Sequence, residues 1–177
     1  MDLILWRHAE ADMAQDGCDD LSRPLTSKGE RQAARMASWL DRHLPEGTRV
    51  LVSPARRTEQ TVQPLGRKYK LRDELVPESS ADDVLSLVKW DPLNGPQSKG
   101  SFLLVGHQPY IGDIVSRLLG MNEASCPVRK GSVWWLRTRV RDGQVQTILM
   151  TVANPELVSR GWDASKRSFT MESYEYF

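Results

Sequence analysis

The stretch "LILWRHAEAD", residues 3–12, determines how the rest of the chain is interpreted. Its first four residues are apolar and have the pattern of a short strand that is buried on both faces. Arg7 and His8 follow without a break. Because a protein core rarely accepts such side chains, either the strand simply meets solvent at this point or a functional site begins there.

Length and composition predict a single domain. The chain has 177 residues, 40% of them hydrophobic, which is enough for one substantial core and too few for two. Its 24 basic and 23 acidic residues leave a formal net charge of +1. No overall field therefore favours nucleic acid or an anionic membrane as a partner, and any anion-binding site must be local.

The cysteines and the apolar segments predict a cytoplasmic protein. Cys18 and Cys126 are two thiols in a domain of ordinary size, and we interpret them as reduced residues rather than as a disulfide. The first apolar run has no basic leader before it and is cut short by Arg7, and no segment has the length needed to cross a bilayer.

Helix and strand patterns alternate along the chain. Ser27 and Glu30 have the spacing of a capping box, and Pro64 is expected to end or kink the second helix near Gln63. The stretch 91–100 is rich in turn residues and is expected to be a loop. Apolar residues have helical spacing in four segments, 23–44, 55–69, 82–90 and 110–120, and strand patterns occur at 3–6, 49–54, 102–105, 132–140 and 144–152.

This alternation predicts an α/β fold, a three-layer α/β/α sandwich with a mostly parallel central sheet. The last two strands flank Asp142-Gly143 and are expected to form an antiparallel hairpin. We expect residues 1–155 to form the single domain. Residues 156–177 form a C-terminal extension whose order the sequence does not indicate.

Three strands of this sheet end in polar residues. The first delivers Arg7 and His8, the second Ser53 followed by Arg57, and a later one His107. Taken singly, each is more typical of a solvated strand end, a charged helix face or a satisfied core histidine. Because ligands of open α/β sheets bind beyond the carboxyl ends of the strands, their joint placement favours one site.

Arginine and histidine together favour phosphoryl chemistry. The guanidinium group matches phosphate oxygens bidentately, and a neutral imidazole can attack phosphorus to form a covalent phosphohistidine. The chain has three histidines without metal-ligand spacing, of which His43 is expected at the surface, so we expect neither a metal nor another cofactor. Neither cysteine heads a Cys-x5-Arg loop, which disfavours a cysteine phosphatase.

Four motifs in order resemble the histidine phosphatase superfamily, most closely its small SixA-type phosphohistidine phosphatase branch. They extend over most of residues 1–155: "RHAEA" at 7–11, "RPLTSKG" at 23–29, "SPARRTEQT" at 53–61 and "VGHQP" at 105–109.

The resemblance implies a role for each matching residue. His8 would accept the phosphoryl group, and Arg7, Arg57 and His107 would form the phosphate pocket, with His107 protonated or donating. Arg57 takes this role rather than its neighbour at position 56 because the family spacing is Ser-Pro-x-x-Arg-x-x-Gln-Thr. Arg23 would add a substrate contact near the mouth.

Two positions depart from the family pattern. Ala9 stands where the family has glycine, and a small residue there should keep the close backbone approach without a positive φ. Larger members carry an acidic proton donor on a loop after the second helix, where this chain has Glu74, with Glu78 nearby. Glu74 is the candidate general acid, and a solvated loop carboxylate is the alternative reading.

The resemblance implies that the substrate is phosphohistidine on a protein. It also implies a role in signal transduction. A weakly supplied acid suits a phosphoramidate, and the short connections leave an open pocket. The alternatives are a broad-specificity phosphomonoesterase acting on small phosphorylated metabolites, and a noncatalytic phosphate-binding module.

Overall fold

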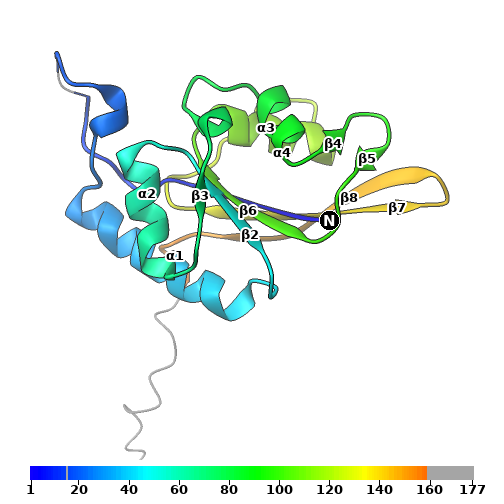
Figure 1. Cartoon of the computed structure of the whole chain (residues 1–177), viewed down its shortest axis with the longest axis horizontal. Coiled ribbons are helices and arrows are strands. Elements are labelled where there is room, and N and C mark those ends of the chain that lie inside the picture. Colours follow the sequence, from blue (N-terminus) through cyan, green and yellow to red (C-terminus); the bar gives the residue numbers. More distant parts are fainter. Residues whose placement is uncertain (15, 159–177) are drawn as a thin grey trace, which may run out of the picture.

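The structure, a computed structural model, describes residues 1–14 and 16–158 as one sheet with helices on both faces (Figure 1). The strands lie in the order β3-β2-β6-β1-β7-β8. The first four are parallel, and β7 and β8 are antiparallel to their neighbours. This confirms the predicted three-layer α/β/α fold. The strands are β1 (Asp2–Arg7), β2 (Arg49–Val52), β3 (Lys70–Leu71), β6 (Ser101–Gly106), β7 (Val133–Arg141) and β8 (Gln144–Ala153).

Alternate residues of the central strands point to opposite faces of the sheet, and each face has its own core. Ile4 and Trp6 of β1 pack on the side of α1 and α2, whereas Leu3 and Leu5 pack on the side of α3 and α4. Figure 1 shows α1 below the sheet and α3 above it. The helices are α1 (Ser27–His43), α2 (Arg56–Val62), α3 (Ala81–Leu87) and α4 (Tyr110–Leu119), with the short 3₁₀ turns η1 (Asp20–Ser22), η2 (Gln63–Leu65) and η3 (Asp73–Leu75).

The helix ends differ from the sequence expectation at one point. Thr26, not Ser27, caps α1, because its extended backbone brings its hydroxyl within 3.0 Å of the Gly29 amide. The capping box expected at Ser27 and Glu30 is therefore wrong. The helix cap lies one residue earlier, at Thr26. As expected from Pro64, α2 stops at Val62 and gives way to the η2 turn.

The stretch expected to be a plain loop contains a small hairpin, made of β4 (Trp90–Asp91) and β5 (Gly95–Pro96). The Asp91 carboxylate accepts hydrogen bonds from the amides of Leu93 and Asn94 and so closes the turn. Between β7 and β8, Asp142 and Gly143 both have positive φ, which confirms the predicted two-residue hairpin turn.

The chain continues to pack beyond residue 155. Arg35 of α1 donates to the Pro155 carbonyl at 3.2 Å, and Val158 packs against the core on the α1 side. The remainder of the extension, residues 159–177, lies outside the described residues. Cys18 is exposed and Cys126 buried, and both are free thiols. Within the described ranges, no helix has the length and apolar character required to cross a membrane.

Candidate active site

The carboxyl ends of β1, β2 and β6 meet at one edge of the sheet, with β6 in the middle. The ladder continues one residue past each outer strand, since the His8 amide donates to the Gly106 carbonyl and the Ser53 amide to the Val105 carbonyl, both at 3.0 Å. These bonds place the residues that follow the strands side by side. The imidazole rings of His8 and His107 have centroids 5.3 Å apart.

His8 is buried and uncharged, with one nitrogen left as an acceptor. Its Nδ1 lies 2.6 Å from the Ala9 carbonyl oxygen, which can only accept, so Nδ1 carries the proton and Nε2 keeps a lone pair. Burial, and then the positive charges of Arg57 and Arg7, lower the pKa of His8 to about 3. The ring is therefore neutral at neutral pH.

His107 has the opposite tautomer. Its Nδ1 faces Nη2 of Arg57 at 3.4 Å and must accept, so Nε2 carries the proton and donates to the Ser53 hydroxyl at 2.8 Å. Burial, and then the neighbouring His8 and Arg57, lower the pKa of His107 to about 2. The sequence left two forms open for His107, a charged imidazolium and a neutral ring that donates a hydrogen bond. The structure contains the neutral ring.

Two arginines bring positive charge and unused donors to this edge. Arg57 lies in the first turn of α2, is 2% exposed, and donates to the Asp20 carbonyl and carboxylate at 2.7 and 2.9 Å. Arg7 donates from Nη1 to the Val128 carbonyl at 2.6 Å. The Nε–H groups of both arginines are buried and have no partner among the described residues. The Nε–H of Arg35 in α1 is also unpartnered among these residues, so the two groups at this edge are available to an acceptor without being unique in that respect.

The sequence analysis did not identify Asp20. Its carboxylate pairs with Arg57 and, at 2.8 Å, with Nε of Arg23, which also donates to the Asp12 carbonyl. Burial would raise the pKa of Asp20, but the hydrogen bond and charge of Arg57 outweigh it and lower that pKa. The spacing of Asp20 and Arg23 was visible in the sequence. The contact with Arg57 was not, because 37 positions separate the two residues.

The loop after His8 is held by its backbone. The Ala9 amide donates to the Thr61 hydroxyl at 3.0 Å, and the Glu10 carbonyl accepts from the Thr26 amide at 3.0 Å. Ala9 is fully buried and has no positive φ, so alanine is accommodated here without strain. A Cβ on Gly29 would lie 1.9 Å from the Glu10 oxygen, so α1 approaches this loop closely only because position 29 is glycine.

Glu74 lies in η3 and forms an ion pair with Arg72. Arg72 donates to both of its carboxylate oxygens, at 2.6 and 3.1 Å, and this contact lowers the pKa of Glu74. In the described part of the chain its side chain has no hydrogen bond to either His8 or His107. This arrangement disfavours Glu74 as a general acid, and Glu78 lies exposed beyond it.

The arrangement as a whole is suited to an anion that undergoes nucleophilic attack. A neutral imidazole presents a lone pair at Nε2, and two guanidinium groups hold donors that have no acceptor. A tetrahedral oxyanion would supply acceptors to both arginines and would lie against the nucleophile.

The sequence is similar to those of known phosphatases. The sequence profile of the histidine phosphatase superfamily (branch 1) matches residues 3–79. Phosphohistidine phosphatase SixA of Escherichia coli is 35% identical over 122 residues, which cover 67% of this chain and 74% of that protein.

Solved structures show the same fold. The structure of the protein histidine phosphatase SixA complexed with tungstate is 27% identical, with a TM-score of 0.70, and the match covers 88% of this chain and 97% of that one. A phosphoserine phosphatase mutant from Entamoeba histolytica, 16% identical with a TM-score of 0.63 over 88% of this chain and 98% of that one, shares the fold alone.

The two buried imidazoles should make the fold sensitive to acid. Unfolded histidine takes up a proton near pH 6.5, whereas the pKa of His8 in the fold is about 3, so below pH 6.5 the unfolded state binds more protons and stability falls. At about pH 5.5 the loss is about 1.4 kcal/mol for each such imidazole. We expect urea unfolding of His8→Asn, which cannot titrate, to lose about 1.4 kcal/mol less than the wild type between about pH 7.5 and 5.5. An equal loss in both proteins would contradict burial of the neutral ring.

Proposed function

The chain belongs to the histidine phosphatase superfamily and is a phosphatase, and we propose that it hydrolyses phosphohistidine carried on a protein, without a metal, through a covalent phosphate on His8. Arg7, Arg57 and His107 would hold the phosphoryl group, and Arg23 would contact the substrate at the mouth of the site. The bridge from Arg23 through Asp20 to Arg57 supports that placement of Arg23.

The observation that carries the proposal is the hydrogen bond from Nδ1 of His8 to the Ala9 carbonyl. It leaves Nε2 unprotonated, which is the form of imidazole that attacks phosphorus. As the Nε2–P bond forms, the ring acquires positive charge, and the carbonyl oxygen stabilises the Nδ1–H end of that charge. The bond to the departing group breaks in the same step. Water then attacks the phosphorus atom, releases phosphate and restores His8.

The two unused guanidinium donors support the role of the arginines. The Nε–H of Arg7 and the Nε–H of Arg57 would each donate to a phosphoryl oxygen. These donors are fixed before substrate arrives, because other atoms of the same side chains are bound to the Val128 carbonyl and to Asp20. Such preorganisation stabilises charge that develops in the transition state. The solved SixA contains tungstate, a tetrahedral oxyanion, which is consistent with an oxyanion site in the family.

The charges of the site favour a phosphoramidate over a phosphate ester. Asp20, which pairs with Arg57, and Glu74, the acid suggested by the sequence, both have lowered pKa values and are poor proton donors. An alkoxide leaving group needs such a donor. A departing imidazole can take up a proton on its own ring nitrogen and leave neutral, so it depends less on the enzyme for an acid.

Two short connections at the catalytic edge support a substrate carried on a protein. Residues 53–55 join β2 to α2 and residues 107–109 join β6 to α4, whereas the connection from β1 to α1, residues 8–26, is longer and carries Asp20 and Arg23. The two short connections leave their sides of the site open to a large substrate. The broad phosphomonoesterase remains the second candidate because the fold is shared with a phosphoserine phosphatase. The intact nucleophile disfavours a noncatalytic binding module.

His8→Ala should abolish turnover without unfolding the protein. Removal of the nucleophile leaves no covalent route, and position 8 lies after the last residue of β1. When turnover is quenched rapidly without acid, we expect the wild type to carry protein-bound phosphate that is acid-labile and alkali-stable. The His8→Ala protein should carry no such phosphate. Circular dichroism checks the fold. Substantial hydrolysis by the folded variant would exclude this mechanism.

Arg57→Ala should cost far more activity than Arg56→Ala, its matched neighbour. Arg57 is buried beside both histidines, whereas Arg56 is exposed. We expect kcat/KM to fall about 100-fold or more for Arg57→Ala and less than about twofold for Arg56→Ala, with Arg57→Lys between them because lysine keeps the charge but loses the planar fork. Equal losses at the two positions would show that the phosphate pocket is assigned wrongly.

The substrate preference should separate the two candidate functions. We expect kcat/KM for a phosphohistidine-bearing protein domain to exceed that for sugar phosphates and phosphoserine peptides by at least about tenfold, roughly 1.4 kcal/mol of transition-state stabilisation. The comparison is made side by side at one pH and one salt concentration. If a metabolite phosphate is turned over as fast as every phosphohistidine protein tried, the phosphomonoesterase reading replaces this one.

A further inference from the structure

A basic groove of about 880 Å³ lies along the outer edge of the sheet, between β2, β3 and the end of α3. Half of its twelve lining residues are lysine or arginine, and none is acidic. We call it the edge groove. Its cationic residues are Arg49, Arg67, Lys68, Lys70, Arg72 and Lys89.

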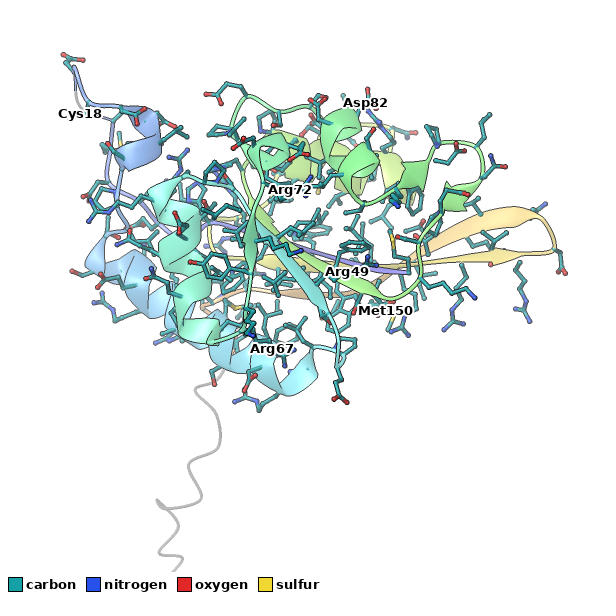
Figure 2. All side chains as sticks on the ribbon, viewed as in Figure 1. Cys18, Arg49, Arg67, Arg72, Asp82 and Met150 are labelled. Carbon is teal, nitrogen blue, oxygen red and sulfur yellow. The ribbon has the colours of Figure 1, made fainter. Side chains whose placement is uncertain are left out.

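Three of these cations are fixed by the fold. The Arg49 guanidinium lies 3.9 Å from the centroid of the Phe102 ring and donates to the Lys99 carbonyl. Arg67 pairs with Asp41 at 3.3 Å, and Arg72 pairs with Glu74. Figure 2 shows the three arginines spread along the side of the molecule where β2 and β3 end the sheet. The charges of Arg67 and Arg72 are thus offset by carboxylates, whereas the charge of Arg49 is held in position without one among the described residues.

The other three cations have no carboxylate to neutralise them. Lys68, Lys70 and Lys89 are exposed, and none of them forms an ion pair within the described ranges. The net charge of the whole chain is only +1, so this concentration is local and not a consequence of composition. Tyr69 and Leu87, both half-buried, add apolar surface to the lining. The groove therefore matches a ligand that is both acidic and partly apolar.

Protection of an exposed sheet edge explains only part of this charge. Lysines on edge strands prevent pairing with another chain, and Lys70 in β3 fits that role. Arg49 on β2 and Lys89 after α3 come from other elements and do not lie on the edge strand. Together with Lys68 and Lys70 they line the groove from three separate segments of the chain.

One end of the edge groove, at Arg72, lies beside the carboxyl end of β2, which leads into the catalytic edge. The Arg72 amide donates to the Val52 carbonyl at 2.9 Å, and the next residue, Ser53, accepts the hydrogen bond of His107. We propose that the edge groove binds an extended acidic segment of the phosphorylated protein substrate and so brings its phosphohistidine to His8. This inference rests on the proposed function. Carboxylates of the segment would pair with the lysines, and its apolar side chains would cover Tyr69 and Leu87.

Charge reversal in the groove tests the proposal by separating protein substrate from small substrate. The variant is Lys68→Glu/Lys70→Glu, and the matched control is Arg139→Glu/Arg141→Glu, which makes the same charge change on exposed residues of β7. We expect the groove variant to lower kcat/KM for a phosphohistidine-bearing protein of net negative charge by at least about tenfold at low salt, and the control by less than about threefold. Turnover of p-nitrophenyl phosphate should stay unchanged in both. An equal loss in the two variants, or a matching loss with p-nitrophenyl phosphate, would overturn the proposal.

A binding measurement distinguishes failure of the groove from failure of the proposed function. The probe is a short fluorescein-labelled peptide in which glutamate alternates with valine. Its binding is measured by fluorescence anisotropy. Wild type and His8→Ala should bind it equally, and Lys68→Glu/Lys70→Glu at least about tenfold more weakly. Binding without turnover of phosphohistidine protein would overturn the function and leave acidic recognition in place. Equal binding by the groove variant, or tighter binding of oligothymidylate than of the peptide, would overturn the groove.

Discussion

The hydrogen bonds that β6 makes to both of its neighbours are the constraint on which the catalytic edge depends. They continue past the strands, from the His8 amide to the Gly106 carbonyl and from the Ser53 amide to the Val105 carbonyl. Because the three strands are parallel, their carboxyl ends coincide, and residues from three distant segments become neighbours. The 5.3 Å separation of the two imidazole rings follows from that register.

Burial then determines the protonation of the site. Two imidazoles lie beside two guanidinium groups, and among residues 1–14 and 16–158 the one carboxylate that pairs with Arg57 is that of Asp20. Burial and the surrounding positive charge keep both rings neutral. A site with this excess of positive charge favours an anion, and the neutral ring at position 8 is able to attack it. The same features that cost stability in acid would make His8 the nucleophile of the proposed mechanism.

The catalytic edge and the edge groove divide recognition between them. The catalytic edge provides a few buried, fixed donors, which suit a phosphoryl group common to many substrates. The edge groove provides a wider set of exposed charges, which are screened by salt and suit a flexible acidic segment. The short connections after β2 and β6 are consistent with the proposal that a surface of this second kind selects among substrates.

The sequence by itself determined the fold class and predicted the residues of the candidate site, because apolar periodicity and motif order are local properties. It placed Arg7, His8 and His107 after buried strands, and the parallel sheet required them to meet. Tertiary structure decided what depends on contacts between distant residues. The pairing of Asp20 with Arg57, the tautomers of the two histidines and the capture of Glu74 by Arg72 each depend on which atoms the fold brings within hydrogen-bonding distance. The edge groove is of the same kind, since its cations lie on β2, β3 and the segment after α3, and no local pattern relates them.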